Sequence, residues 1–135
     1  FGLQAGLKVV LCIGEKIEER KAGQVEGVLD KQLDQGLSGV SKDIAPDDLA
    51  IAYEPVWAIG TGLVAETGDI EAAHAHVRKR LIDIFGDKGS QIRILYGGSV
   101  KPDNCSEILG VDNVDGVLVG GASLQAESFS RIVLA

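Results

Sequence analysis

Residues 52–62 read AYEPVWAIGTG, and they follow a short apolar run. A single carboxylate, Glu54, therefore stands where that run ends. Pro55 removes a backbone donor and stiffens the exit from a strand, while the Trp57 indole supplies a large apolar wall. Two glycines then let the chain bend toward a ligand. The segment predicts a lid that begins beside a base for proton abstraction. An ion pair or an ordinary turn remains an alternative for Glu54.

Four short apolar runs organise the rest of the sequence. The first and the last are nearly continuous in apolar residues, which is typical of parallel strands buried on both faces. Helical patterns lie between the runs, and residues 70–84 carry an apolar face at i+3 and i+4 spacing. The predicted strands are 8–13, 49–53, 92–96 and 116–120, and the predicted helices are 16–37, 70–84, 103–109 and 124–133.

The alternation of strands and helices predicts parallel strands with right-handed crossovers in one domain spanning residues 1–135. Two architectures remain open from the pattern alone. One is a small doubly wound sheet, and the other is part of a (β/α)8 barrel. In both architectures, ligands bind at the carboxyl ends of the strands.

The predicted carboxyl ends of the strands carry chemical groups, whereas the opposite ends look like ordinary polar turns. Besides Glu54, the sequence places Gly97-Gly98-Ser99 after one strand and Gly120-Gly121 after the next. Glycines let backbone N–H groups approach an anion closely, and a following helix N-terminus favours negative charge. Two such loops at successive strand ends predict a phosphate site. A pair of glycines that merely turns the chain is the alternative.

Composition excludes several classes of partner. The net charge of −7 argues against nucleic acid, because phosphate backbones are bound by basic patches. No apolar run approaches about 20 residues, so no membrane partner is expected, and no secretory leader is visible. Cys12 and Cys105 lack the spacing of zinc ligands, so no metal is expected. Cys12 reads as a buried apolar residue, and the expected location is the cytoplasm.

The AYEPVWAIGTG segment resembles the active-site segment of the triosephosphate isomerases. The resemblance extends through CIGE (12–15), LYGGSV (95–100) and NVDGVLVGGASL (113–124), and it covers essentially the whole chain. It implies a (β/α)8 barrel, of which this sequence matches the C-terminal half, from strand five to helix eight. It also implies glycolytic interconversion of glycerone phosphate and D-glyceraldehyde 3-phosphate without a cofactor.

The resemblance assigns roles to individual residues. Glu54 matches the base that moves a proton between two carbons of the substrate. Gly60 matches a lid residue whose N–H binds the substrate phosphate, and Ser99, Gly120 and Gly121 match the residues that hold the phosphate from below. This family is a standard worked example of a glutamate base under a closing lid. These roles are therefore implied by the family resemblance.

Further residues match supporting roles in the same family. Glu15 and Tyr53 resemble the partners between which the Trp57 indole exchanges its hydrogen bond as the lid moves. Tyr96 resembles the tyrosine that holds the closed lid through the backbone of Ala65.

The resemblance also places structural residues away from the strand ends. Arg78 and Asp115 match a structural ion pair. His74 is expected to be structural and His76 to be solvated.

The family's catalytic lysine and electrophilic histidine lie in the first four βα units, to which nothing in this sequence corresponds. The loop that builds the family's homodimer lies there too. The isolated chain is therefore expected to be inactive. Half of a barrel would also expose two sheet edges and one apolar face, which predicts self-association or aggregation.

Two alternatives remain from the sequence. One is another phosphate-binding barrel enzyme, for example from amino-acid biosynthesis, which would share the glycine loops. The other is a non-catalytic half-barrel that binds phosphate or associates with itself.

Overall fold

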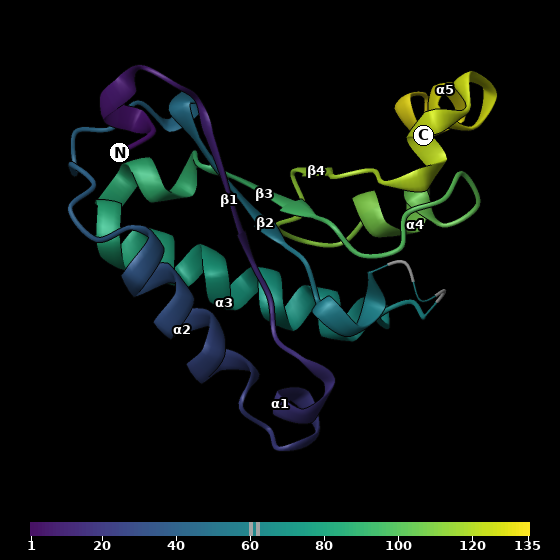
Figure 1. Ribbon diagram of the computed structural model, residues 1–135, viewed down its shortest axis with the longest axis horizontal. Coiled ribbons are helices and arrows are strands. Elements are labelled where there is room, and N and C mark those ends of the chain that lie inside the picture. Colours follow the sequence, from purple (N-terminus) through teal and green to yellow (C-terminus); the bar gives the residue numbers. More distant parts are fainter. Residues whose placement is uncertain (60, 62) are drawn as a thin grey trace.

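A single sheet of four parallel strands forms the centre of the molecule (Figure 1). The computed structural model describes residues 1–59, 61 and 63–135. The strands lie in the order β1-β2-β3-β4, so each strand neighbours the next one along the chain. They are β1 (Val9–Ile13), β2 (Leu49–Tyr53), β3 (Arg93–Tyr96) and β4 (Gly116–Val117).

This strand order decides between the two predicted architectures. A doubly wound sheet reverses its order at a switch point and carries helices on both faces. Here the order never reverses, and the helices α2 (Val25–Gly36) and α3 (Thr67–Phe85) cover the same face of the sheet (Figure 1). The arrangement is that of consecutive βα units of a barrel, as predicted.

The remaining helices are short. A single helix over 16–37 was predicted, but Gly23 adopts a positive φ of 68° and separates α1 from α2. Gly86, with φ 61°, ends α3 at the position where the apolar pattern stops. The short helices are α1 (Ile17–Lys21), α4 (Cys105–Leu109) and α5 (Ala126–Val133), and the 3-10 turns are Leu3–Ala5, Pro46–Asp48, Val56–Ala58, Gly86–Ser90 and Gly121–Leu124.

The core lies between the sheet and its two long helices. Ile51, Ile94 and Leu81 are completely buried there. On β1, by contrast, exposure alternates, and the side chains of Val10 and Cys12 are exposed on the opposite face. The predictions that β1 is buried on both faces and that Cys12 is buried are therefore wrong. No element in the described part of the chain covers that second face over β1.

The two outer strands of the sheet, β1 and β4, each pair on one side only among the described residues. In the same part of the chain, no helix is both long enough and apolar enough to cross a membrane.

Candidate active site

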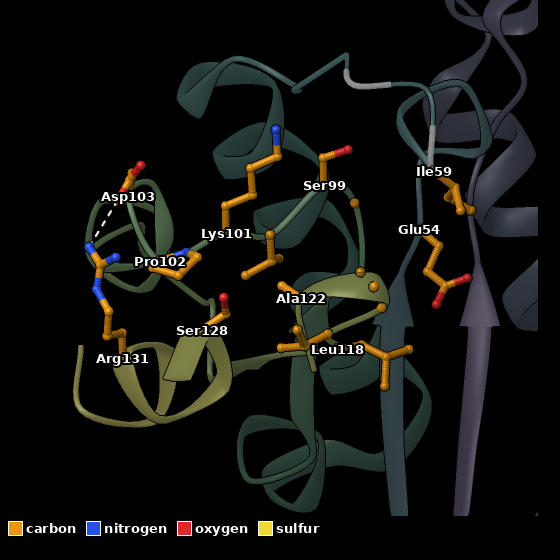
Figure 2. Close-up of a pocket in the computed structure, with 16 residues that line it drawn as sticks. Glu54, Ile59, Ser99, Lys101, Pro102, Asp103, Leu118, Ala122, Ser128 and Arg131 are labelled. Atoms are coloured by element: carbon orange, nitrogen blue, oxygen red, sulfur yellow. Dashed lines mark hydrogen bonds and ion pairs between the residues drawn. The ribbon is translucent and has the colours of Figure 1, made fainter. Parts of the chain in front are cut away.

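The carboxyl ends of β2, β3 and β4 open onto one cavity of about 860 Å³ (Figure 2). Glu54, Ser99, Gly120 and Gly121, which the sequence singled out on three separate segments, all line it. Parallel strands bring their carboxyl ends to one edge, which explains why residues 66 positions apart meet there. Gly60, the remaining predicted site residue, lies outside the described residues.

Glu54 follows β2 directly, and its side chain faces the cavity (Figure 2). Its backbone N–H donates to the Ile13 carbonyl oxygen at 2.7 Å, so the sheet pairing continues through this residue. The carboxylate is half-buried, and it makes no hydrogen bond or ion pair with any side chain that the structure describes. Glu54 therefore presents an unengaged acid to the cavity.

Two glycines make room for Glu54. A Cβ atom at Gly97 would lie 2.5 Å from Glu54 Cγ and 2.9 Å from Oε1, and one at Gly14 would collide with the Glu54 backbone carbonyl. Any side chain at these positions would displace the acid. Although Cys12 is exposed, partial loss of solvent around its thiol raises the pKa of that thiol, and the nearby Glu54 carboxylate raises it further.

A second carboxylate, Glu15, lies two residues beyond the end of β1, and it is fully buried. It accepts hydrogen bonds from Trp57 Nε1 at 2.8 Å, from the Tyr53 hydroxyl at 3.2 Å and from Arg20 Nη1 at 3.0 Å. Arg20 also pairs with Asp69 at the start of α3, at 2.5 Å. This Glu15 cluster fixes the start of the segment that follows Glu54. The Tyr53 pKa is raised, first by burial and then by the Glu15 charge.

The loop after β3 is held from both sides. The Ser99 hydroxyl donates to the Ala58 carbonyl oxygen at 2.8 Å, which joins this loop to the segment after Glu54. The Asn104 side chain donates to the Ser99 carbonyl oxygen at 3.0 Å and accepts from the Lys101 backbone N–H at 2.8 Å. Asn104 was not predicted from the sequence. An asparagine three residues after Lys101 is a local signal, because asparagine side chains can bond the backbone three residues back.

The loop after β4 is open. A Cβ atom at Gly120 or Gly121 would meet no atom within 4 Å, and neither glycine has a positive φ. Packing therefore does not require glycine at these two positions. The free space above the backbone is compatible with close approach of an anion.

Tyr96 at the end of β3 and His74 on α3 are fully buried. Burial raises the pKa of Tyr96, and the Ala65 backbone near its hydroxyl opposes this rise, although no hydrogen bond to that hydroxyl is formed among the described residues. His74 Nδ1 lies 2.9 Å from the Asn113 carbonyl oxygen, to which it donates. Burial lowers the pKa of His74, so the ring is held neutral and structural.

Two further contacts tie α3 to its neighbours. The predicted pair between Arg78 and Asp115 is present at 2.6 Å. His76 was predicted to be solvated, which is wrong: its Nε2 lies 2.8 Å from Asp30 Oδ1 on α2, because α2 and α3 pack side by side.

The family model for triosephosphate isomerase matches residues 1–135, the whole chain. The chain belongs to the triosephosphate isomerase family. It is 64% identical to triosephosphate isomerase of Nitratidesulfovibrio vulgaris and 66% identical to that of Oleidesulfovibrio alaskensis, over 100% of this chain and 54% of each relative. The crystal structure of triosephosphate isomerase from Bartonella henselae superposes with a TM-score of 0.87 at 42% identity, covering 97% of this chain and 52% of that one.

These matches identify the sheet as half of a (β/α)8 barrel, and the chain spans about half the length of the curated relatives that it matches. They favour the triosephosphate isomerase family over other phosphate-binding barrel enzymes.

The cavity also holds polar residues that were not predicted from the sequence. Lys101, Asp103, Ser128 and Arg131 line its far side (Figure 2). Arg131 Nη2 lies 3.0 Å from Asp103 Oδ1, so α5 and the loop before α4 are joined there. No group of three or more histidine, cysteine or acidic side chains is placed to hold a metal ion in the part of the chain that the structure describes.

Proposed function

We propose that this chain supplies the base and the phosphate cradle of a triose-phosphate isomerase, which interconverts glycerone phosphate and D-glyceraldehyde 3-phosphate. The observation that carries the proposal is the shared cavity: an unengaged carboxylate and two glycine-rich loops face the same space. Membership of the family supports the same substrate class.

In this proposal Glu54 removes a proton from the carbon that bears the hydroxyl group and returns it to the neighbouring carbon. The half-buried position suits a base that must remain accessible to a small substrate. Ser99 and the open backbone at Gly120 and Gly121 hold the phosphate, and the Ser99 hydroxyl, which donates its one hydrogen to the Ala58 carbonyl oxygen, exchanges that partner for the phosphate when the substrate binds. The family resemblance assigns to Gly60, which lies outside the described residues, a backbone N–H that binds the same phosphate. No cofactor takes part.

The groups that stabilise the charge on the enediolate would come from the half of the relatives that this chain does not span. We also propose that the complete enzyme is a homodimer. The family resemblance places the loop that builds the dimer in the half that this chain does not span. Stabilisation of developing charge is commonly a large part of an enzyme's rate enhancement. Activity must therefore be tested in a complete barrel.

The decisive experiment joins this chain behind the N-terminal half of the Nitratidesulfovibrio vulgaris relative. Glu54→Gln keeps the size of the side chain but removes the base, so kcat should fall about a thousandfold. Glu71→Gln, which removes an exposed carboxylate from α3, should leave kcat unchanged. Unimpaired turnover by Glu54→Gln would show that another group is the base.

A second candidate function is phosphate binding without catalysis by the 135-residue chain itself. The exposed second face of β1 favours this candidate, because it leaves one side of the site without a wall. No histidine lines the cavity among the described residues. In this case the chain should bind phosphate, show no isomerase activity and associate with itself through its open face, which size-exclusion chromatography measures.

A further inference from the structure

The charged residues that line the cavity are unequally engaged. Arg131 and Asp103 pair with each other at 3.0 Å. Glu54 is the proposed base. The remaining charged residue is Lys101. No carboxylate in the described part of the chain lies within 4.0 Å of its ammonium group. Lys101 is thus a cation in the cavity whose charge no neighbouring acid neutralises.

The position of Lys101 is fixed relative to the proposed phosphate loop. Its backbone N–H is bound by the same Asn104 side chain that holds the Ser99 carbonyl oxygen. Pro102 follows and restricts the backbone further. Figure 2 shows the Lys101 and Ser99 side chains running in the same direction on the rim of the cavity. The backbone of Lys101 is therefore held to the loop that carries Ser99.

The rest of the molecule works against an anionic ligand. The chain carries a net charge of −7, and Glu54 adds a negative charge inside the cavity itself. A phosphate dianion approaching this surface is repelled unless a local positive charge offsets the field. An unpaired ammonium at the rim provides such a charge, and its effect is felt over a Debye length.

We propose that Lys101 is a further binding residue, which draws the phosphate dianion of the substrate to the cradle formed by Ser99 and the Gly120-Gly121 loop. This inference rests on the proposed function. It adds a residue that attracts the ligand electrostatically and does not take part in proton transfer. It predicts that the contribution of Lys101 shrinks as salt screens the charge.

The test uses the 135-residue chain and inorganic phosphate, with the single tryptophan, Trp57, as the fluorescence probe. At low ionic strength Lys101→Gln should raise the Kd for phosphate about threefold and Lys101→Glu about tenfold, whereas Lys101→Arg should retain the affinity. At high salt these differences should fall below about twofold. Far-UV circular dichroism of each variant verifies its fold.

Lys88→Gln is the matched control. Lys88 lies before β3, at the opposite end of the sheet, and pairs with Asp43 at 3.5 Å. The substitution Lys88→Gln removes the same formal charge far from the cavity, so the Kd for phosphate should not change. Equal Kd values for wild type, Lys101→Gln and Lys101→Glu would overturn the inference, as would an equal effect of Lys88→Gln or the absence of saturable binding.

The two proposals can fail separately. Glu54→Gln tests proton transfer through kcat in the complete barrel, whereas the lysine series tests phosphate affinity without any turnover. Loss of kcat in Glu54→Gln together with an unchanged Kd in Lys101→Glu would keep the isomerase proposal and remove the role of Lys101.

Discussion

Glu15 and Glu54 follow neighbouring strands of the same sheet, yet their surroundings differ completely. Glu15 is fully buried and accepts hydrogen bonds from Trp57, Tyr53 and Arg20. Glu54 is half-buried and has no side-chain partner among the described residues. A charge that is buried and fully bonded holds structure together, whereas a charge left free in a cavity is available for chemistry. The difference lies in the neighbours, since the residue type is the same.

The largest expected effect on stability separates the two acids directly. Glu15→Gln removes the negative charge that pairs with Arg20. It also replaces one accepting oxygen of the buried carboxylate with a donating NH2 group. The free energy of unfolding should therefore fall by about 3 kcal/mol. Glu54→Gln should change it by less than about 0.5 kcal/mol, because no bond is lost. Urea unfolding of both variants measures the difference, and equal losses would show that the two carboxylates are equivalent.

The glycines beside Glu54 give the next effect. In Gly97→Ala the new Cβ would lie 2.5 Å from Glu54 Cγ, so the carboxylate must move. Misplacing a catalytic group costs up to about a hundredfold in rate, and we expect kcat of the complete barrel to fall by tens of times. Gly27→Ala on α2 is the control, because a Cβ there meets nothing within 4 Å. Unchanged turnover in Gly97→Ala would mean that the position of Glu54 is not critical.

The sequence could predict some residues of the site and not others. Glu54, Ser99 and the Gly120-Gly121 pair were found because the carboxyl ends of parallel strands must share one edge, so position along the chain is enough. The bonds of Glu15 came only through the family resemblance. No local pattern shows that Trp57, 42 residues away, will donate to Glu15.

Other features depended on contacts that no local pattern contains. Arg131 lines the cavity because α5 packs beside α4. Lys101, by contrast, follows the same strand end as Ser99, so its place in the cavity could have been predicted from its position along the chain. Cys12 was predicted to be buried from its apolar neighbours, but apolar neighbours do not reveal whether anything covers the second face of a sheet. His76 was predicted to be solvated because the spacing on α3 does not show that Asp30 lies opposite.

Tyr53 and Tyr96 offer a second comparison between a bonded and an unbonded polar group, here a single hydroxyl on each residue. They are partners in the β2–β3 register, and both are fully buried. The Tyr53 hydroxyl donates to Glu15, whereas the Tyr96 hydroxyl has no partner among the described residues. Tyr53→Phe should lower the free energy of unfolding by about 1.5 kcal/mol, and Tyr96→Phe should leave it unchanged or raise it slightly.

Thermal or urea unfolding of the two variants under the same conditions measures this difference. A larger loss in Tyr96→Phe than in Tyr53→Phe would contradict it, since the unpartnered hydroxyl would then carry the stabilising bond.

His74 gives the smallest effect, through pH. Its ring packs edge-on against Tyr53, with centroids 5.8 Å apart, and lies 6.4 Å from the Tyr96 ring, so it supports both tyrosines. Burial lowers the pKa of His74, and the bond to the Asn113 carbonyl opposes this only partly. A lowered pKa in the folded state means that the unfolded chain binds the proton first. Stability should therefore be complete above the ordinary histidine pKa and decline as the pH falls below it.

The decline due to His74 should be no steeper than about 1.4 kcal/mol per pH unit below the ordinary histidine pKa. His74→Gln has no titrating ring but can still donate to the Asn113 carbonyl, so its unfolding free energy should fall less steeply over that range. His76→Gln is the control, since it removes the histidine that is bound to Asp30 at the α2–α3 contact. If His74→Gln keeps the wild-type slope, the buried ring does not couple protonation to folding, and the support under the two tyrosines is independent of pH.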